Sequence, residues 1–189
     1  MTDTQRTPET AADVLRAIMD AGVSLQAARM LAAQSAFETA DFAYIWNYNL
    51  GNITTNDADY VILPGNDLHF KPYASLADGA TGFVEYLTAR GLLPFAETGD
   101  LQGYVDRLQA IHYAGDGDYT AYYNGMAGKL QSLYGVTPSP PMRAIAKAGI
   151  ILLLGGVVAV GIHGGVFGDL RKTARRLLPR EITRALRSF

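Results

Sequence analysis

The chain has 189 residues and no cysteine, which excludes disulfide bonds, thiolate metal sites and a cysteine nucleophile. Its net charge of −2 is the sum of two parts with opposite net charge. Residues 1–142 contain 7 Lys and Arg against 16 Asp and Glu, a balance of −9, whereas residues 143–189 contain 9 against 2, a balance of +7. Parts of opposite charge are expected to face different surroundings, and the length suits one domain with an appended segment.

The first forty residues predict two helices. The N-terminal residues are polar and lack the apolar run of a signal peptide. Thr7, followed by Pro8, is expected to cap a first helix that stops near Gly22. Ser24 is expected to cap a second helix, in which apolar residues recur at three- and four-residue spacing. That helix ends at Glu38, where the helix dipole disfavours a carboxylate and therefore favours the protonated acid.

An aromatic and amide-rich turn follows Glu38, with Trp46, Tyr48 and Asn49 among its residues. Aromatic rings stack on sugar faces, and amide side chains form hydrogen bonds with hydroxyl and N-acetyl groups. An apolar wall beside Glu38 would raise the pKa of its carboxyl and keep it protonated as a general acid. The alternative interpretation is a solvated acid at the end of a helix.

Four segments then carry a resemblance to a known family. QSAFET at 34–39 and NYNLGNI at 47–53 resemble the glucosaminidase family of peptidoglycan hydrolases, glycoside hydrolase family 73, in the lysozyme-like superfamily. FKPYASL at 70–76 is similar to the F-x-x-Y-x-S segment of that family. HYAGDGDY at 112–119 is similar to its G-Y-A-T-D-P-x-Y segment, with Gly, Thr and Pro replaced. The resemblance implies a mainly α (α+β, lysozyme-like) fold that cleaves β-1,4 glycosidic bonds.

The same resemblance implies roles for individual residues. Glu38 would protonate the leaving oxygen, and Tyr119 matches a tyrosine that lines the cleft beside the acid in that family. Tyr119 is also interpretable as a core tyrosine with a bonded hydroxyl. The predicted substrate-binding residues are Trp46, Tyr48, Asn49, Tyr113 and Tyr119.

A small β lobe is predicted between the second and third helices. A β-like run at 60–63, a turn and a return run at 68–70 indicate a hairpin. One of Asp57, Asp59 and Asp67 is a candidate for the second catalytic carboxylate, which would position a water or stabilise an oxocarbenium ion. The alternative is that these acids only form turns. No histidines occur at metal-ligand spacing, so neither a metal nor a cofactor is predicted.

The second half of the domain predicts three helices. Ser75 begins a capping-box-like pattern that leads into a helix over 79–89. A second helix is expected over 101–111, after a start at Asp100. The third is expected over 118–133, after a loop rich in Asp and Gly.

The remaining sequence predicts a membrane anchor. The predicted divisions are a glycan-cleaving domain at 1–135, a Pro-rich linker at 136–143, a transmembrane helix at 144–168 and a basic amphipathic tail at 169–189. Residues 148–168 carry no formal charge if His163 is neutral, and at about 1.5 Å per residue they reach roughly 31 Å, enough for a bilayer core. A buried core helix is the alternative. Glycine pairs at positions 161 and 165, and at 164 and 168, favour close helix contact and with it a homo-oligomer.

The tail at 169–189 combines basic residues with apolar positions around Pro179. This pattern predicts a surface that lies on anionic lipid headgroups. Binding to packaged nucleic acid is a second use of the same charge, and a solvated tail is a third interpretation. The positive-inside tendency assigns the tail to the cytoplasm, or to the interior of a membrane-containing particle, with the acidic domain towards the cell wall.

Together these features predict a membrane-anchored enzyme that acts on peptidoglycan by hydrolysis or by lytic transglycosylation. A C-terminal anchor without a signal peptide favours a phage virion protein that opens the wall for genome delivery. A bacterial wall-remodelling enzyme is one alternative. A non-catalytic wall-binding or assembly protein on the same scaffold is another, and the acidic domain favours it because many wall lysins are basic.

Overall fold

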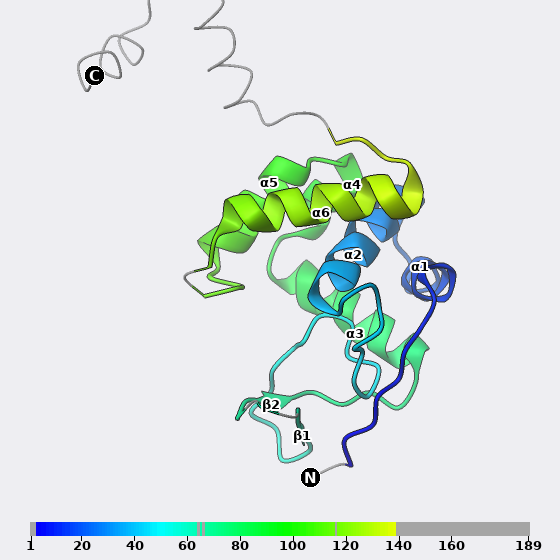
Figure 1. Cartoon of the computed structure of the whole chain (residues 1–189), viewed down its shortest axis with the longest axis vertical. Coiled ribbons are helices and arrows are strands. Elements are labelled where there is room, and N and C mark those ends of the chain that lie inside the picture. The colour runs from blue at the N-terminus through cyan, green and yellow to red at the C-terminus, as the bar shows by residue number, and fades with distance from the viewer. Residues whose placement is uncertain (1–2, 64, 66, 116, 139–189) are drawn as a thin grey trace, which may run out of the picture. The chain divides into compact units, whose positions relative to one another are not determined.

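Six α-helices and one two-stranded antiparallel sheet occur in the computed structural model, which describes residues 3–63, 65, 67–115 and 117–138. The helices are α1 (Ala11–Asp20), α2 (Leu25–Glu38), α3 (Leu76–Ala89), α4 (Leu93–Thr98), α5 (Leu101–Ala110) and α6 (Tyr119–Tyr134). The strands are β1 (Val61–Ile62) and β2 (His69–Phe70). The prediction of a mainly helical domain with a small β hairpin is therefore confirmed (Figure 1).

Helix α2 is the centre of the packing. It contacts α1, α4 and α6, and α6 crosses in front of it in Figure 1. Residues on every side of α2 are buried, from Ala27 to Ala36, and most of them are alanines. Alanine lets neighbouring helices approach closely, and a helix that is apolar all round belongs in a core. This packing fixes the position of the C-terminal end of α2, where Glu38 lies.

Four of the residues expected at helix starts are confirmed as caps. The Oγ of Ser24 accepts a hydrogen bond from the Ala27 amide at 3.1 Å, which caps α2. Ser75 caps α3 by accepting from the Asp78 amide and donating to the Asp78 carboxylate. The carboxylates of Asp100 and Asp118 cap α5 and α6 by accepting hydrogen bonds from amides in the first turn of each helix. Each cap satisfies amides that have no partner within the helix.

The start of α1 differs from the prediction. Thr10 is the cap of α1, because its Oγ accepts from the Asp13 amide at 3.2 Å. Thr7 is buried instead, and its Oγ accepts from the Tyr48 amide at 3.0 Å. Thr7 therefore joins the N-terminal segment to the turn after α2, a contact that no local pattern encodes.

Two further differences concern the helices after the hairpin. Helix α3 begins at Leu76 rather than at residue 79, because its cap is Ser75. Helix α4 was not predicted, since six residues are too few to establish a periodicity. Pro94 lies in the first turn of α4, and Gly99 ends it with a left-handed φ of 70°.

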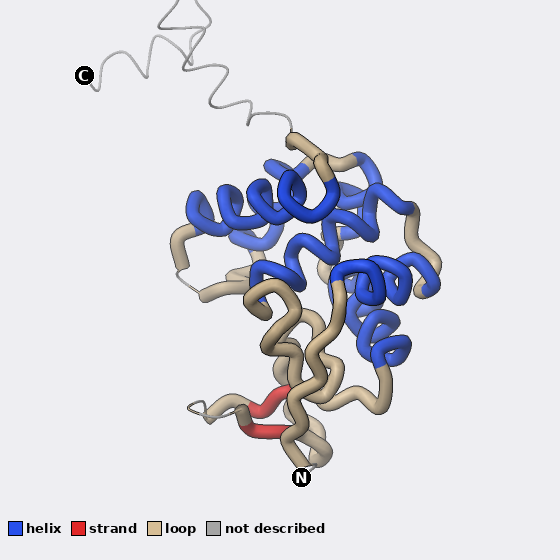
Figure 2. The backbone as a smooth tube through the Cα atoms, turned by 45° about the vertical axis from the view of Figure 1, so that its right-hand side comes forward, coloured by secondary structure: helices blue, strands red, loops and turns tan. Residues whose placement is uncertain are grey.

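The β hairpin lies with the N-terminal segment at one end of the described domain (Figure 2). Val61 pairs with Phe70 and Ile62 with His69. The hydroxyl of Thr4 donates to the Ile62 carbonyl at 3.1 Å, which attaches the N-terminal segment to β1. Positions 64 and 66 of the predicted turn lie outside the described residues.

The predicted appendage also lies outside them. Residues 139–143 of the linker, the transmembrane helix at 144–168 and the tail at 169–189 are not described. Within the described part of the chain, no helix combines the length and the apolarity needed to cross a bilayer.

Candidate active site

Glu38 is the last residue of α2, and its side chain is partly buried. The chain then turns sharply, because Ala40, Asp41 and Phe42 all have left-handed φ values, of 49°, 56° and 66°. The Thr39 hydroxyl donates to the Ser35 carbonyl at 2.6 Å across the last turn of the helix. Non-glycine residues adopt this conformation only where surrounding contacts hold them, and such residues cluster at functional sites.

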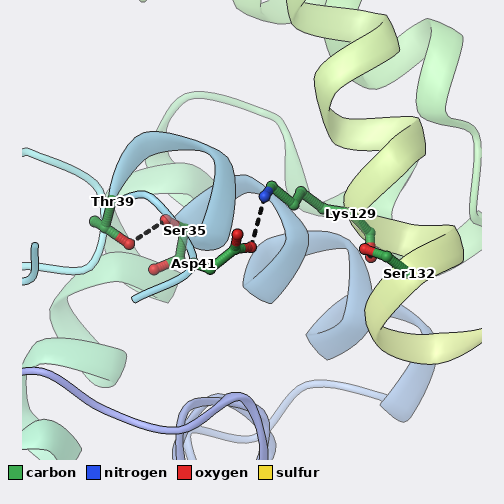
Figure 3. A network of polar contacts seen from close by, with 5 residues as sticks. All are labelled: Ser35, Thr39, Asp41, Lys129 and Ser132. Carbon is green, nitrogen blue, oxygen red and sulfur yellow. Dashed lines mark hydrogen bonds and ion pairs between the residues drawn. The ribbon is translucent and has the colours of Figure 1, made fainter. Parts of the chain in front are cut away.

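An ion pair holds this turn against α6. Lys129 Nζ lies 2.6 Å from an oxygen of Asp41, and it is the one salt bridge within the described residues. Figure 3 shows Lys129 reaching from α6 towards the turn, beside the Thr39–Ser35 hydrogen bond. The pair therefore joins the turn that follows Glu38 to α6, the helix that contains Tyr119 and Tyr122.

Tyr122 of α6 is the direct partner of Glu38. Its hydroxyl donates to Oε1 of Glu38 at 2.5 Å. Burial raises the pKa of the Glu38 carboxyl, while hydrogen bonds from Tyr122 and Asn52 lower it, and the net direction is upward. A carboxyl with a raised pKa keeps its proton to higher pH, which is what a general acid requires.

Three buried or partly buried tyrosines surround the carboxyl. Burial raises the pKa values of Tyr104, Tyr113 and Tyr122, and the negative charge of Glu38 raises them further. Tyr104 donates to the side-chain oxygen of Gln34, one helical turn before Glu38. The rings of Tyr113 and Tyr122 meet edge to face, with centroids 6.4 Å apart. The phenols therefore stay neutral and offer hydrogen-bond donors without adding negative charge.

The segment that follows the turn lies against this cluster. The Asn52 side chain donates to the Glu38 backbone carbonyl at 3.2 Å. The Tyr113 hydroxyl donates to the Gly51 carbonyl at 2.7 Å. A Cβ at Gly51 would lie only 2.4 Å from the ring of Phe83, so a side chain at this position would collide with α3. The motifs at 34–39, 47–53 and 112–119 therefore meet around Glu38.

Asn49, a predicted sugar-binding residue, has a different role in the structure. Its side chain is 2 % exposed and donates to the carbonyls of Ile53 and Lys71, each at 2.9 Å. Its oxygen accepts from the Ile53 amide at 2.8 Å. The side-chain amide of Asn49 is fully engaged in these bonds, which hold the loop together.

The other predicted sugar-binding residues of this loop remain partly exposed. Trp46 and Tyr48 are both partly buried. The carbonyl of Tyr48 lies so close to α3 that a Cβ at Gly79 would be 2.0 Å from it. Trp46 forms backbone bridges with Arg6 and Asn49. The loop backbone is therefore fixed, while the two rings keep surface for a ligand.

Tyr119 also uses its hydroxyl within the protein. The hydroxyl accepts from the Ala114 amide at 3.0 Å and donates to the Gly115 carbonyl at 3.3 Å. These bonds brace the loop before α6. The Tyr119 ring lies 6.2 Å from the Tyr122 ring. Tyr119 thus borders the cluster, and Tyr122, one helical turn further, makes the contact with Glu38.

Two of the three candidate second carboxylates lie in the loop before β1. Asp57 and Asp59 are both exposed. The Asp57 amide donates to the Thr55 hydroxyl at 3.1 Å. The pKa of Glu38 is governed by burial, Tyr122 and Asn52, and neither aspartate is among these influences. Asp67 is exposed as well, beyond β1.

Sequence reasoning missed three residues of the site, namely Gln34, Tyr104 and Tyr122. A signal existed for Gln34, which is four residues before Glu38 and therefore on the same helix face. Tyr122 likewise follows Tyr119 at helical spacing. Tyr104 lies in a helix distant in sequence, and its approach to Gln34 depends on how α5 packs.

Within the described ranges, no group of three or more His, Asp or Glu side chains is arranged to hold a metal ion.

Comparison with known proteins found no match. None of the protein-family models, curated proteins and solved structures that were compared matches this chain.

Proposed function

We propose that this chain is a peptidoglycan-cleaving enzyme with a lysozyme-like fold, in which Glu38 is the general acid. The motifs at 34–39, 47–53, 70–76 and 112–119 and their resemblance to the glucosaminidase family support the substrate class. The mainly helical domain with a small hairpin is compatible with that family.

The observation that carries the proposal is the environment of Glu38. Its carboxyl lies at the end of a buried helix and accepts a hydrogen bond from Tyr122 at 2.5 Å. Its pKa is raised, mainly by burial. Segments distant in sequence contribute Asn52 and Tyr113 to the same place. Burial raises the pKa of Glu38 even though hydrogen bonds from Tyr122 and Asn52 lower it, and this environment suits a proton donor better than that of a solvated surface acid.

In the proposed reaction, protonated Glu38 gives its proton to the glycosidic oxygen as the bond breaks. The Tyr122 hydroxyl then stabilises the carboxylate that forms, because it donates to the same oxygen. The partly exposed rings of Trp46 and Tyr48 provide stacking surfaces for sugars. Tyr113 and Tyr119 support the loops around the acid.

The second half of the reaction has two forms. In hydrolysis, Asp57 or Asp59 would position a water or stabilise the oxocarbenium ion. In lytic transglycosylation, a hydroxyl of the substrate itself attacks, and no second carboxylate is needed. The exposed positions of both aspartates favour the second form.

The proposed location is a membrane. Residues 144–168 would span it once, and the basic tail at 169–189 would bind anionic headgroups or packaged nucleic acid. The acidic domain would then face the cell wall. A phage virion membrane is the proposed setting, and a bacterial envelope is its competitor. Labelling with antibodies on purified particles and on host envelopes distinguishes the two.

A second candidate function is a non-catalytic wall-binding or assembly protein. The balance of −9 over residues 1–142 favours it, because an acidic domain does not approach an anionic wall by electrostatic attraction.

The deciding experiment is a peptidoglycan assay of the full chain beside its Glu38→Gln variant. Wild type is expected to clear peptidoglycan in a zymogram. Glu38→Gln is expected to reduce the rate by at least about 100-fold, since a general acid contributes roughly 10²–10⁴. The matched control is Glu85→Gln, an exposed glutamate of α3, which is expected to retain wild-type activity.

Each other outcome has a clear meaning. No clearing by a folded wild-type chain, with folding checked by circular dichroism, would support the non-catalytic function. Equal clearing by Glu38→Gln would assign the acid to another residue. Mass spectrometry of the released fragments distinguishes the two forms of the reaction, because transglycosylation leaves 1,6-anhydro ends and hydrolysis leaves reducing ends.

A further inference from the structure

A cavity lies at the other end of α2 from the Glu38 turn. Its volume is about 320 Å³, and α2, α4, α6 and the segment after α6 contribute to its walls. In Figure 1 that segment, coloured yellow, turns back at the C-terminal end of α6. Arg29 lines the cavity nine residues before Glu38, which corresponds to roughly 13 Å along the helix. The cavity is therefore distinct from the candidate active site.

The cavity has one charge. Among the described residues that line it, Arg29 is the only one with a charged side chain. The one salt bridge of the described domain joins Lys129 to Asp41, so within that part of the chain no carboxylate lies within 4.0 Å of Arg29. An arginine without an acidic partner on the wall of a cavity favours an anionic ligand.

The donors near this charge are not all used. Arg29 Nε and the Tyr134 hydroxyl are both buried, and neither has a hydrogen-bond partner within the described residues. Burial raises the pKa of Tyr134 to about 12, and the positive charge of Arg29 opposes that rise. The two groups therefore lie close enough to interact. Buried donors without an acceptor cost free energy. The described residues therefore offer no acceptor to this side of the guanidinium, and its charge stays uncompensated beside the cavity.

The rest of the lining is neutral and mixed. Gln26, Thr98 and Thr137 provide an amide and two hydroxyls, whereas Met30 and Leu130 provide apolar surface. A phosphate carries between one and two negative charges at neutral pH, whereas the described lining supplies one positive charge. A carboxylate matches that charge and fits the planar guanidinium as a paired acceptor. The volume is at the small end for ligand pockets and suits one or two amino-acid residues.

We propose that this cavity binds the carboxyl terminus of a short peptide, with Arg29 pairing with the carboxylate. The Gln26 amide donates to the carbonyl of the adjoining peptide bond. The hydroxyls of Thr98 and Thr137, which already donate within the protein, accept from its N–H. Met30 and Leu130 contact a small side chain. This site does not depend on glycan cleavage. The peptide has two natural sources, namely the D-alanine ends of cell-wall peptides and the L-residue ends of proteins.

The test is isothermal titration calorimetry on the full chain, with four peptides as probes. These are N-acetyl-D-alanyl-D-alanine, N-acetyl-L-alanyl-L-alanine and the C-terminal amide of each. At least one acid is expected to bind, and its amide is expected to bind at least 10-fold more weakly. Preference for the D acid identifies wall peptides as the source, and preference for the L acid identifies protein termini. Binding of both acids alike assigns a carboxylate site without stereochemical selection.

Substitutions then test the role of Arg29. Arg29→Gln is expected to weaken binding of the acid at least 10-fold, and Arg29→Lys is expected to have a smaller effect because the charge remains. The matched control is Arg16→Gln on the exposed surface of α1, which is expected to leave the affinity unchanged. Circular dichroism checks that each variant folds.

Three results would overturn the proposal. They are the absence of binding by both acids, equal affinity for acid and amide, and tighter binding of inorganic phosphate than of either acid. All three are measured by calorimetry on the wild-type chain, with inorganic phosphate as a fifth probe. They therefore remain decisive even if Arg29→Gln fails to fold. A loss of peptidoglycan cleavage has no bearing on them.

Discussion

Helix α2 and the loop at 39–53 lie next to each other in the chain but are held in different ways. The helix is surrounded by apolar contacts, with Leu31 and several alanines fully buried. The loop is held by side-chain hydrogen bonds, above all those of Asn49. Apolar packing tolerates small shifts, whereas hydrogen bonds demand defined directions. Glu38 lies at the boundary between them. The helix positions it, and it accepts hydrogen bonds from Asn52 of the loop and from Tyr122 of α6.

The loop also contains most of the unusual backbone. Six of the seven non-glycine residues with positive φ in the described chain lie between Ala40 and Asn52. Each such residue costs roughly 1–2 kcal/mol for an ordinary side chain. The amides of Asp41 and Tyr44 offset this cost by donating to the carbonyls of Ala36 and Thr39. The surroundings of the loop thus impose its backbone conformation, whereas the sequence of α2 itself favours a helix.

The largest effect is expected where the loop presses on α3. A Cβ at Gly79 would lie 2.0 Å from the Tyr48 carbonyl oxygen, which belongs to a backbone that is itself fixed. Gly79→Ala should therefore lower the free energy of unfolding by more than about 3 kcal/mol. Urea unfolding, followed by fluorescence of the single tryptophan, Trp46, measures this.

The control for this substitution is Gly128→Ala in α6, where a Cβ would meet nothing within 4 Å. Alanine is the better helix former, so a gain of up to about 1 kcal/mol is expected. Wild-type stability in Gly79→Ala would show that the loop yields more easily than these contacts indicate.

A substitution in α2 is expected to act through packing alone. Leu31→Ala removes a fully buried side chain and should cost about 3 kcal/mol. Leu25, also in α2, is 42 % exposed, and Leu25→Ala should change the free energy of unfolding by less than about 0.5 kcal/mol. The same urea measurement checks both variants. If they lose similar amounts of unfolding free energy, the contrast between the buried and exposed faces of α2 is wrong.

Loss of a loop amide should have the next largest effect. Asn49→Ala leaves the Ile53 amide and two carbonyls without their partner, at an expected cost of about 2 kcal/mol. Asn124→Ala, on the exposed surface of α6, is the matched control and should be close to neutral. If the two asparagine variants unfold alike, the loop does not depend on Asn49.

The smallest effect on stability is expected at the boundary itself. Tyr122→Phe removes one hydrogen bond, worth about 1 kcal/mol. That bond favours the charged carboxylate and lowers the pKa of Glu38, so its loss should raise the pKa further. Since the protonated acid is the proposed active form, the fall in activity at high pH should move to higher pH.

A titration of the side-chain carboxyl carbons by ¹³C NMR checks the direction, with Glu38→Gln assigning the signal. Tyr44→Phe is the control, because Tyr44 is 53 % exposed. A lower Glu38 pKa in Tyr122→Phe than in wild type would show that Tyr122 supports the protonated form instead.

The raised pKa of Glu38 also determines how the stability of the protein depends on pH. A carboxyl whose pKa is raised on folding contributes stability below its unfolded pKa and loses that contribution as the pH rises through its folded pKa. Glu38→Gln removes this dependence. The melting temperature of Glu38→Gln, relative to that of wild type, should therefore rise as the pH increases through the folded pKa of Glu38.

Sequence patterns predicted the structure correctly wherever the deciding interaction joins residues that are close in the chain. Ser24, Ser75, Asp100 and Asp118 were all predicted as helix starts, because each cap joins residues two or three positions apart. The hairpin was predicted from β-like runs on either side of a turn. Thr7 was assigned wrongly as a cap, because its hydroxyl bonds to Tyr48, 41 residues away.

The sequence by itself determined most of the helices, the hairpin and the candidacy of Glu38, since periodicity, capping and motif order are properties of neighbouring residues. Only the tertiary structure decided which groups meet that carboxyl. Tyr122 is 84 residues from Glu38, and Tyr113 reaches Gly51 across 62 residues. Such contacts depend on how α6 and the segment before it pack against α2 and the loop after it. That packing is set by the sum of many buried surfaces rather than by any one segment.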